Sequence, residues 1–120
     1  MILVDTSIWI DHLRGGNARL VSLLQDQRVL VHPFIIGELA VGNIRQRGTV
    51  LAHLGRLPSA AVATNDEVMH LIERRALAGT GLSWVDAHLI ASAILTPATL
   101  WTLDRTLTIS LARLNLPPDK

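Results

Sequence analysis

The amino-acid sequence predicts an α/β fold with a central parallel β-sheet of four or five strands, flanked by helices on both faces. Short continuous apolar runs, as expected for strands buried on both faces, alternate with longer stretches whose apolar residues recur at helical spacing. No linker or repeat interrupts this alternation, which is typical of βαβ units. A chain of 120 residues with 49% hydrophobic content suffices for one packed core, so we expect residues 1–120 to form a single domain.

The N-terminal segment predicts one strand followed by two helices. Residues 2–4 are a continuous apolar run, and two hydroxyl residues can then cap a helix over residues 8–14. The glycine pair 15–16 ends that helix, and leucines at helical spacing predict a second helix over residues 17–27.

A second strand and two more helices follow. Residues 29–31 are again apolar, and Pro33 can open a helix because the first helical N–H, which proline lacks, has no partner within a helix. Glu38 lies within that helix. Residues 44–57 predict a further helix with apolar and arginine-bearing faces, and Pro58 ends it.

The C-terminal half repeats the alternation. Residues 60–63 are a weak strand candidate, and a capping sequence precedes a helix over residues 68–78. Residues 83–95 predict the next helix, residues 100–103 the next strand, and residues 106–114 a last amphipathic helix.

The composition excludes several classes of site. The chain has no cysteine, which removes disulfides, thiolate metal sites and cysteine nucleophiles, and leaves carboxylates and imidazoles as metal ligands. This fits a reducing cytoplasm, where we expect the protein to act. The apolar runs are far shorter than the ~20 residues that span a bilayer, and no signal segment opens the chain, so we expect no membrane association.

The charge and hydropathy point to binding partners. The net charge is +1, and ten of the eleven basic residues are arginine, which suits planar contacts with phosphate or carboxylate. If four acids share one pocket, the remaining surface is more basic than this sum suggests. The mean hydropathy of +0.36 is high for a small domain and predicts an oligomer or partner interface.

Four acids stand where apolar runs give way to helical segments: Asp5, Glu38, Asp86 and Asp104. In open parallel sheets the ligand crevice lies beyond the carboxyl ends of the strands, and Asp5 and Asp104 each follow a predicted strand directly. Glu38 comes 33 residues after Asp5, about one βαβ unit. Asp86 begins a helix that feeds the strand before Asp104, so we expect it at the opposite end of the sheet unless that helix is tilted or displaced.

Gathering four carboxylates requires compensation, by arginine, by protons or by a hard divalent ion. Two carboxylates ~5 Å apart repel by roughly 3 kcal/mol at an effective dielectric constant near 20. A hard dication such as Mg²⁺ or Mn²⁺ prefers carboxylate and water ligands, and it can orient a water and neutralise a phosphodiester. The sequence therefore favours phosphodiester hydrolysis.

Each acid also has a purely structural interpretation, which the sequence leaves open. Asp5 and Asp104 could be helix N-caps, Ser83 and Asp86 match a capping box, and Glu38 could be a solvated helix residue. Only the joint arrangement of the four favours a metal site.

Four segments in order resemble the motifs of PIN-domain ribonucleases, and specifically of the VapC toxins of prokaryotic toxin–antitoxin pairs. They are residues 4–10, Glu38–Leu39, Asp86–Ala91 and Thr102–Asp104. The resemblance covers essentially the whole chain and implies a PIN-like fold, endonucleolytic RNA cleavage and homodimers. It also implies inhibition by a small cognate antitoxin that fills the acidic pocket or its rim.

Carried over to this chain, the resemblance implies that the four acids bind Mg²⁺ or Mn²⁺ and are catalytic. Asp5 and Asp86 would be direct ligands, Asp104 the next, and Glu38 would act through water.

Several polar residues near the motifs could position the substrate. The hydroxyl of Thr6 or Ser7 could hold the metal shell or a phosphate oxygen, unless it only caps the helix. Arg14 could serve RNA or an antitoxin carboxylate, and Arg45 and Arg47 could contact RNA phosphates or form a solvated face. We expect structural roles for the histidines and tryptophans.

Two rival functions remain. A phospho-acceptor domain with Asp5 as nucleophile lacks a D-x-D pair and an internal lysine. A non-catalytic RNA- or protein-binding module of PIN-like fold fits the apolar excess, and it predicts that metal binding and cleavage are dispensable.

Overall fold

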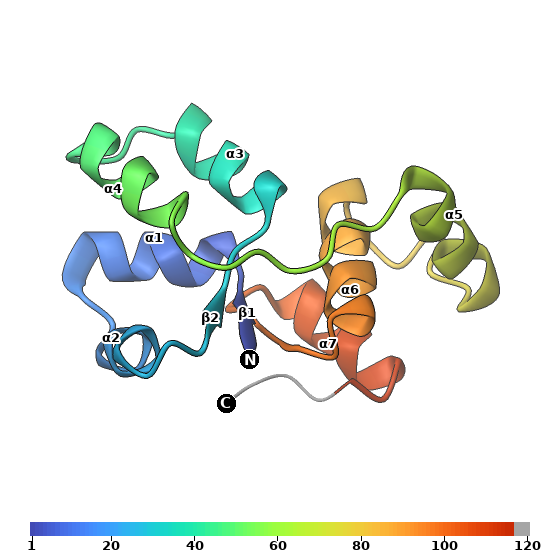
Figure 1. Ribbon diagram of the computed structural model, residues 1–120. Helices are drawn as coiled ribbons and strands as arrows, with labels where there is room; N and C mark the ends of the chain where they lie inside the picture. Colours follow the sequence, from blue (N-terminus) through green and yellow to red (C-terminus); the bar gives the residue numbers. More distant parts are fainter. Residues whose placement is uncertain (117–120) are drawn as a thin grey trace.

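The computed structural model describes residues 1–116, and Figure 1 shows how their helices and strands follow along the chain. The strands are β1 (Ile2–Val4), β2 (Val29–Leu30) and β3 (Thr99–Trp101). The helices are α1 (Thr6–Gly15), α2 (Ala18–Gln25), α3 (Pro33–Val41), α4 (Arg47–Leu54), α5 (Asn65–Arg74), α6 (Trp84–Leu95) and α7 (Arg105–Arg113). Each predicted helix forms, although the ends shift by a few residues.

The two largest shifts have local causes. Helix α4 begins later than predicted because Gln46, just before it, has a left-handed backbone with φ 50°, which a helix cannot include. Helix α5 begins earlier because Thr64 caps it, in a capping box with Glu67. It ends before Ala76, whose φ is 53°.

The first strand of the chain is the centre of the sheet. β1 pairs in parallel with β2 on one side and with β3 on the other, so the strand order is β2-β1-β3. Leu3 is paired with Leu30 and Leu100 and is fully buried. Because the strands are parallel, their carboxyl ends share one edge, where Asp5 and Thr102 directly follow β1 and β3.

The prediction of four or five strands is wrong for the residues that the structure describes, which form three. The predicted strand at residues 60–63 reduces to one parallel bridge between Ser59 and Val31. Val31 donates its N–H to Pro58 and accepts one from Ala60. The alanine-rich continuation has little β-branched side chain to pack on a sheet, and it leaves β2 after this single pairing.

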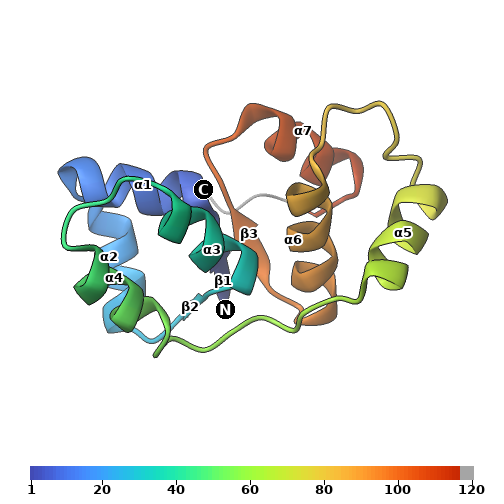
Figure 2. The ribbon, with the colours of Figure 1, turned by 90° about the horizontal axis from the view of Figure 1, so that it is seen from above.

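The helices form two layers around the sheet. Figures 1 and 2 both show α1–α4 on one side and α5–α7 on the other. One core connects the layers, since buried Ile8 and Ile35 from the first layer and Leu89 and Leu107 from the second share a cluster with Leu3. Among the described helices, none has the length and apolar character to cross a membrane.

Candidate active site at the carboxyl edge of the sheet

Asp5 is a buried carboxylate held by two hydroxyl groups. It is the N-cap residue of α1, but its side chain makes no capping hydrogen bond. Instead its Oδ2 accepts from Ser7 Oγ at 2.8 Å and from Thr102 Oγ1 at 2.7 Å. The side chain is 7% exposed, and within residues 1–116 no hydrogen bond reaches its other oxygen, Oδ1. The interpretation of this side chain as a simple cap is therefore wrong.

The two hydroxyl groups are themselves fixed by the backbone after β3. Leu103 donates its N–H to Ser7 Oγ at 3.0 Å, and Asp104 donates its N–H to Thr102 Oγ1 at 3.0 Å. Each hydroxyl oxygen thus accepts a hydrogen bond from a backbone amide and donates its own hydrogen to Asp5. The orientation of both hydroxyl groups is therefore fixed. These hydrogen bonds connect the start of α1 to the end of β3 through the carboxylate of Asp5.

Asp86 forms the capping box that the sequence predicts, and the charges of two other aspartates act on its carboxyl group. Its Oδ2 accepts from Ser83 N at 3.2 Å, and its own N–H donates to Ser83 Oγ at 3.0 Å. Burial raises the pKa of Asp86, the Ser83 hydrogen bonds oppose this rise, and the charges of Asp104 and Asp5 add to it. The carboxylates of Asp104 and Asp5 are thus near enough for their charges to act on Asp86.

The expectation that Asp86 lies at the opposite end of the sheet is wrong, and the reason is topological. A helix that feeds a parallel strand runs antiparallel to it, so its N-terminus lies at the carboxyl edge. Asp86 is in the first turn of α6, which leads into β3, and neither tilt nor displacement of the helix is needed.

Asp104 and Glu38 complete the group from two other helices. Asp104 caps α7, since its Oδ1 accepts from Leu107 N at 2.9 Å, so the capping role is real here. Glu38 is exposed on α3, and its Oε1 accepts from Thr6 Oγ1 at 2.8 Å. Because Thr6 directly follows Asp5, this hydrogen bond joins α3 to the edge that carries the aspartates.

The donor set fits a hydrated hard cation better than a closed metal cage. Among residues 1–116, no three histidine, aspartate or glutamate side chains are grouped so as to hold a metal ion directly. Mg²⁺ usually keeps several waters and binds through one or two carboxylates, so such a group is not required. The available donors are oxygens, and a dication would relieve the repulsion that Asp5 and Asp104 exert on Asp86.

Thr102 is the site residue whose role the sequence did not predict. It belongs to the segment that resembles the fourth motif, yet nothing local shows that its hydroxyl reaches a residue 97 positions earlier. The available signal is a hydroxyl residue that directly follows a buried strand and precedes an acid by two positions. Thr6 and Ser7, which the sequence indicates as substrate-positioning candidates, donate hydrogen bonds to Glu38 and Asp5.

The buried His32 has the structural role expected of the histidines. Its Nδ1 accepts from Phe34 N at 3.0 Å and thereby caps α3, and its Nε2 lies 3.1 Å from Ser92 Oγ. Because Nδ1 accepts, Nε2 carries the proton and donates to Ser92. Burial, and second the charge of His88, lower the pKa of His32 to about 4.

Comparison with known proteins gives a consistent result. A family model described as PIN domain matches residues 2–109. The curated "Ribonuclease VapC32" of Mycobacterium tuberculosis, strains CDC 1551 / Oshkosh and ATCC 25618 / H37Rv, is 53% identical over 108 residues, which are 89% of this chain and 87% of the relative. The crystal structure of PAE2754 from Pyrobaculum aerophilum matches with a TM-score of 0.61 at 21% identity, covering 98% of this chain and 82% of that one. At this identity the crystal structure supports the fold alone.

Proposed function

Because the chain belongs to the PIN-domain family and within it to the VapC-type ribonucleases, we propose that its four acids form the Mg²⁺- or Mn²⁺-dependent centre of an endoribonuclease toxin. Residues 1–120 then form a single PIN domain. The observation that carries the assignment of the centre is Asp5, a buried carboxylate with one oxygen fixed by two hydroxyls, at the edge where the charges of Asp86 and Asp104 also act.

We assign the metal contacts from this geometry. Asp5, through its free Oδ1, and Asp86 would be direct ligands, Asp104 the next, and Glu38 would act through water. A bound dication supplies a lowered pKa of the attacking water and neutralises charge on the phosphodiester. The chain's own contribution is orientation: Ser7 and Thr102 fix Asp5, and Thr6 holds Glu38.

In the hydrolysis, the water oxygen forms a bond to phosphorus and the bond from phosphorus to the leaving ribose oxygen breaks. A carboxylate of the group accepts the water proton, and the leaving oxygen is protonated in turn. Glu38 suits the proton transfer, because it is exposed and only its Oε1 is hydrogen-bonded within the described residues.

The alternative function, a non-catalytic RNA- or protein-binding module, has less support. The chain is 53% identical over 108 residues to a relative named as a ribonuclease, and its own sequence carries the four acids. The phospho-acceptor alternative has no support from the sequence either, because Asp5 is not part of a D-x-D pair and the chain has no internal lysine.

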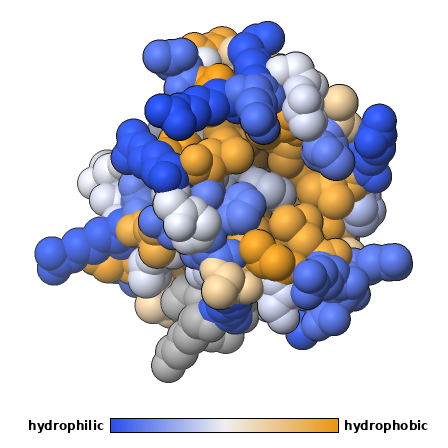
Figure 3. Space-filling model, turned by 90° about the vertical axis from the view of Figure 1, so that its left-hand side faces the viewer, coloured by the Kyte–Doolittle hydropathy of each residue, from blue (hydrophilic) through white to orange (hydrophobic). Residues whose placement is uncertain are grey.

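A cognate antitoxin is the protein partner that the VapC relationship implies, and one face of the molecule suits a bound polypeptide. Figure 3 shows the side on which α1, α2 and α4 lie, where apolar side chains are exposed among hydrophilic ones. A cleft of about 370 Å³ opens there, lined by residues that include Trp9, Leu24 and Leu57. Since its substrate is RNA, we place the toxin in the cytoplasm.

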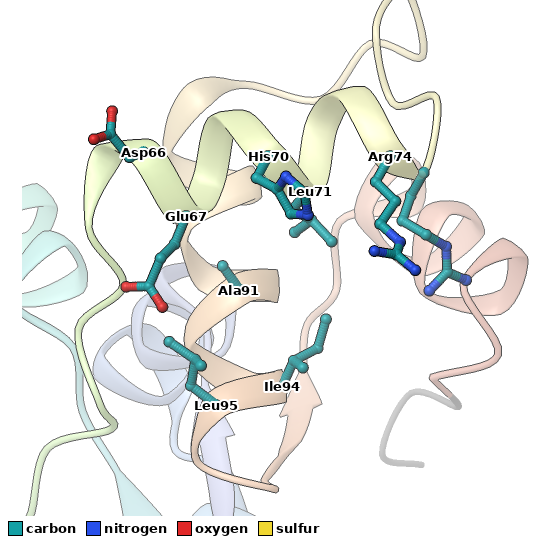
Figure 4. Close-up of a pocket in the computed structure, with 9 residues that line it drawn as sticks. Asp66, Glu67, His70, Leu71, Arg74, Ala91, Ile94 and Leu95 are labelled. Atoms are coloured by element: carbon teal, nitrogen blue, oxygen red, sulfur yellow. The ribbon is translucent and has the colours of Figure 1, made fainter.

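A homodimer is supported by a second surface, the groove between α5 and α6 in Figure 4. The groove has a volume of about 510 Å³ and an apolar floor that includes Ile94 and Leu95, which are 41% and 46% exposed. Asp66 and Glu67 lie at one end of α5 and Arg74 at the other. Two such helices packed antiparallel about a two-fold axis would bring opposite charges together.

The dimer has a direct test. Wild-type protein should elute as a dimer at micromolar concentration in light-scattering chromatography, and Leu95→Glu should elute as a monomer. Val62→Glu, at an exposed apolar residue outside the groove, is the matched control and should remain dimeric. A wild-type monomer at this concentration would contradict the homodimer.

Asp5→Asn tests the catalytic centre. The variant keeps the shape of the side chain but loses its charge, so Mg²⁺-dependent RNA cleavage and growth arrest on expression should both disappear while the protein stays folded. Asp26→Asn makes the same change at an exposed aspartate that follows α2 and should remain fully active. Full cleavage by Asp5→Asn would remove Asp5 from the mechanism.

A further inference from the structure

A cleft of about 450 Å³ lies directly beside Glu38, and the mechanism above does not use it. Its walls come from α1, from the end of α3 and from the loop between α3 and α4, and they include Arg14, Asn43 and Arg45 together with Glu38. The hydrogen bond from Thr6 to Glu38 connects this cleft to the edge that carries Asp5. A ligand that runs along the cleft therefore arrives at the acidic centre.

The arginines near this cleft differ in what they already bind. Arg47 donates from Nε at 3.2 Å and from one terminal nitrogen at 2.8 Å to the carbonyl of Ala40, so its guanidinium serves the end of α3. Arg14 and Arg45 are exposed, and within residues 1–116 neither makes a hydrogen bond or an ion pair. The structure thus separates Arg47 from the two arginines that remain available to a ligand.

The charge of the cleft is opposite to that of the neighbouring centre. Arg14 and Arg45 place two positive charges on its walls against the single carboxylate of Glu38, one oxygen of which is already bonded to Thr6. A polyanion approaching four acids is repelled, so its binding requires cations close by. Guanidinium groups also match the geometry of phosphate oxygens.

We propose that this cleft binds the backbone of single-stranded RNA on one side of the cleaved bond, with Arg14 and Arg45 each contacting one phosphate. The proposal rests on the ribonuclease function and adds a subsite to it. Half-buried apolar side chains of the same cleft, Ile10, Leu13 and Ile44, offer a surface for a base or ribose, while the guanidinium groups bind the phosphates. Both arginines are positioning residues and act on substrate affinity.

The test measures RNA binding separately from cleavage. In an Asp5→Asn background with EDTA, the dissociation constant of a fluorescein-labelled single-stranded RNA is measured by anisotropy over a range of salt concentrations. Arg14→Gln and Arg45→Gln should each weaken binding about three- to ten-fold. Their combination should reduce the slope of log K against log salt by about 1.4, because each phosphate contact on a single strand contributes about 0.7.

Arg113→Gln is the matched control, since Arg113 is an exposed arginine at the end of α7, outside the cleft. It should bind RNA like the parent protein and keep the parent salt slope. In the active protein, Arg14→Gln and Arg45→Gln should raise KM by a larger factor than they lower kcat. Thermal melting should confirm that all variants are folded.

Two outcomes would overturn the proposal. One is an affinity and salt slope in the double variant equal to those of Arg113→Gln. The other is unchanged RNA binding with loss of binding to a glutamate-rich peptide, which would assign the cleft to a protein. Failure of the catalytic assignment gives a different result, because it appears as RNA cleavage by the Asp5→Asn protein itself, seen on a gel.

Discussion

Asp5 and His32 occupy equivalent places in the fold and use them in opposite ways. Each is the N-cap residue of the helix that follows a parallel strand, and each side chain is buried. His32 caps its helix and shares its other ring nitrogen with Ser92, so the whole side chain is used to hold the fold together. Asp5 leaves its helix without a side-chain cap and is held instead by Ser7 and Thr102, with one oxygen free.

The difference shows how to distinguish a structural polar residue from a functional one at the same kind of position. At His32 every polar atom has an internal partner and the surroundings favour the neutral form, as the lowered pKa of about 4 records. At Asp5 the partners are all hydrogen-bond donors to one oxygen, Oδ2, and the other oxygen, Oδ1, keeps its lone pairs for an external cation.

Among the variants that test this comparison, Thr102→Val should cause the largest loss of RNA cleavage. Valine keeps the shape of threonine but removes the donor to Asp5 and the acceptor for Asp104 N–H. We expect a 10- to 100-fold loss of cleavage, the usual cost of removing a group that orients a metal ligand, measured as kcat with labelled RNA and a Mg²⁺ titration.

Two further variants sharpen this result. Thr102→Ser keeps the hydroxyl and should restore most of the activity. Thr80→Val also removes a partly buried hydroxyl hydrogen bond, here to the Leu77 carbonyl. Because Thr80 lies outside the centre, this variant should cleave RNA normally. Equal activity in Thr102→Val and Thr80→Val would mean that the orientation of Asp5 is unimportant.

His32→Leu should give the largest loss of stability, about 2–4 kcal/mol, because it leaves Phe34 N–H and Ser92 Oγ without partners. His88→Leu is the matched comparison: it is also buried, between Phe34 and Trp84, but neither ring nitrogen has a partner among the described residues. Its cost should stay below about 1 kcal/mol. Urea unfolding measures both, and equal losses would contradict the distinction.

Acid should destabilise the fold through His32. Its pKa is about 4 in the fold against 6.5 ordinarily, so the unfolded chain takes up the proton first as the pH falls. The contribution of His32 to the free energy of unfolding is complete above pH ~6.5. It falls by up to about 3 kcal/mol as the pH is lowered from there to ~4. Urea unfolding at steps from pH 7 to pH 4 measures the slope, and His32→Leu should show a shallower one.

Asp86→Asn should give the smallest change in stability. The change should be a gain, whereas loss of an acid with a lowered pKa would reduce stability at neutral pH. Burial and the neighbouring aspartates raise the pKa of Asp86, so the stability that it contributes is present in acid and is lost as the pH rises through its titration. Without metal at neutral pH, the asparagine variant should therefore melt slightly higher than the wild type. Addition of Mg²⁺ should raise the melting temperature of the wild type and not that of the variant.

The local parts of the fold follow from the sequence, and the long-range parts do not. Apolar runs locate all three strands, and Thr64 and Ser83 mark the starts of two helices with their capping boxes. The fourth strand fails because sequence pattern cannot tell one bridge at Ser59 from a full pairing. Its apolar content is equally consistent with the partly exposed loop that forms, in which Ala60 and Ala63 are buried and Val62 is exposed.

The sequence indicates where some of the candidate site residues lie, but not the hydrogen bonds that hold them. Asp5 and Asp104 could be placed because strand ends locate them directly. Asp86 was misplaced because helix direction was not taken into account, although the topology of parallel sheets determines it. Thr102 had no predicted role because its partner lies 97 residues away, and only the folded chain brings the two together.

That separation has a consequence for the order in which the protein acquires its activity. During synthesis β1 is made before β3, so Asp5 leaves the ribosome well before the hydroxyl that orients it, which lies 97 residues later in the chain. A growing chain can build the first helical layer and still lack a complete nuclease centre. The orientation of Asp5 therefore depends on a residue that is added 97 positions later, and the centre is complete only after that residue has been made.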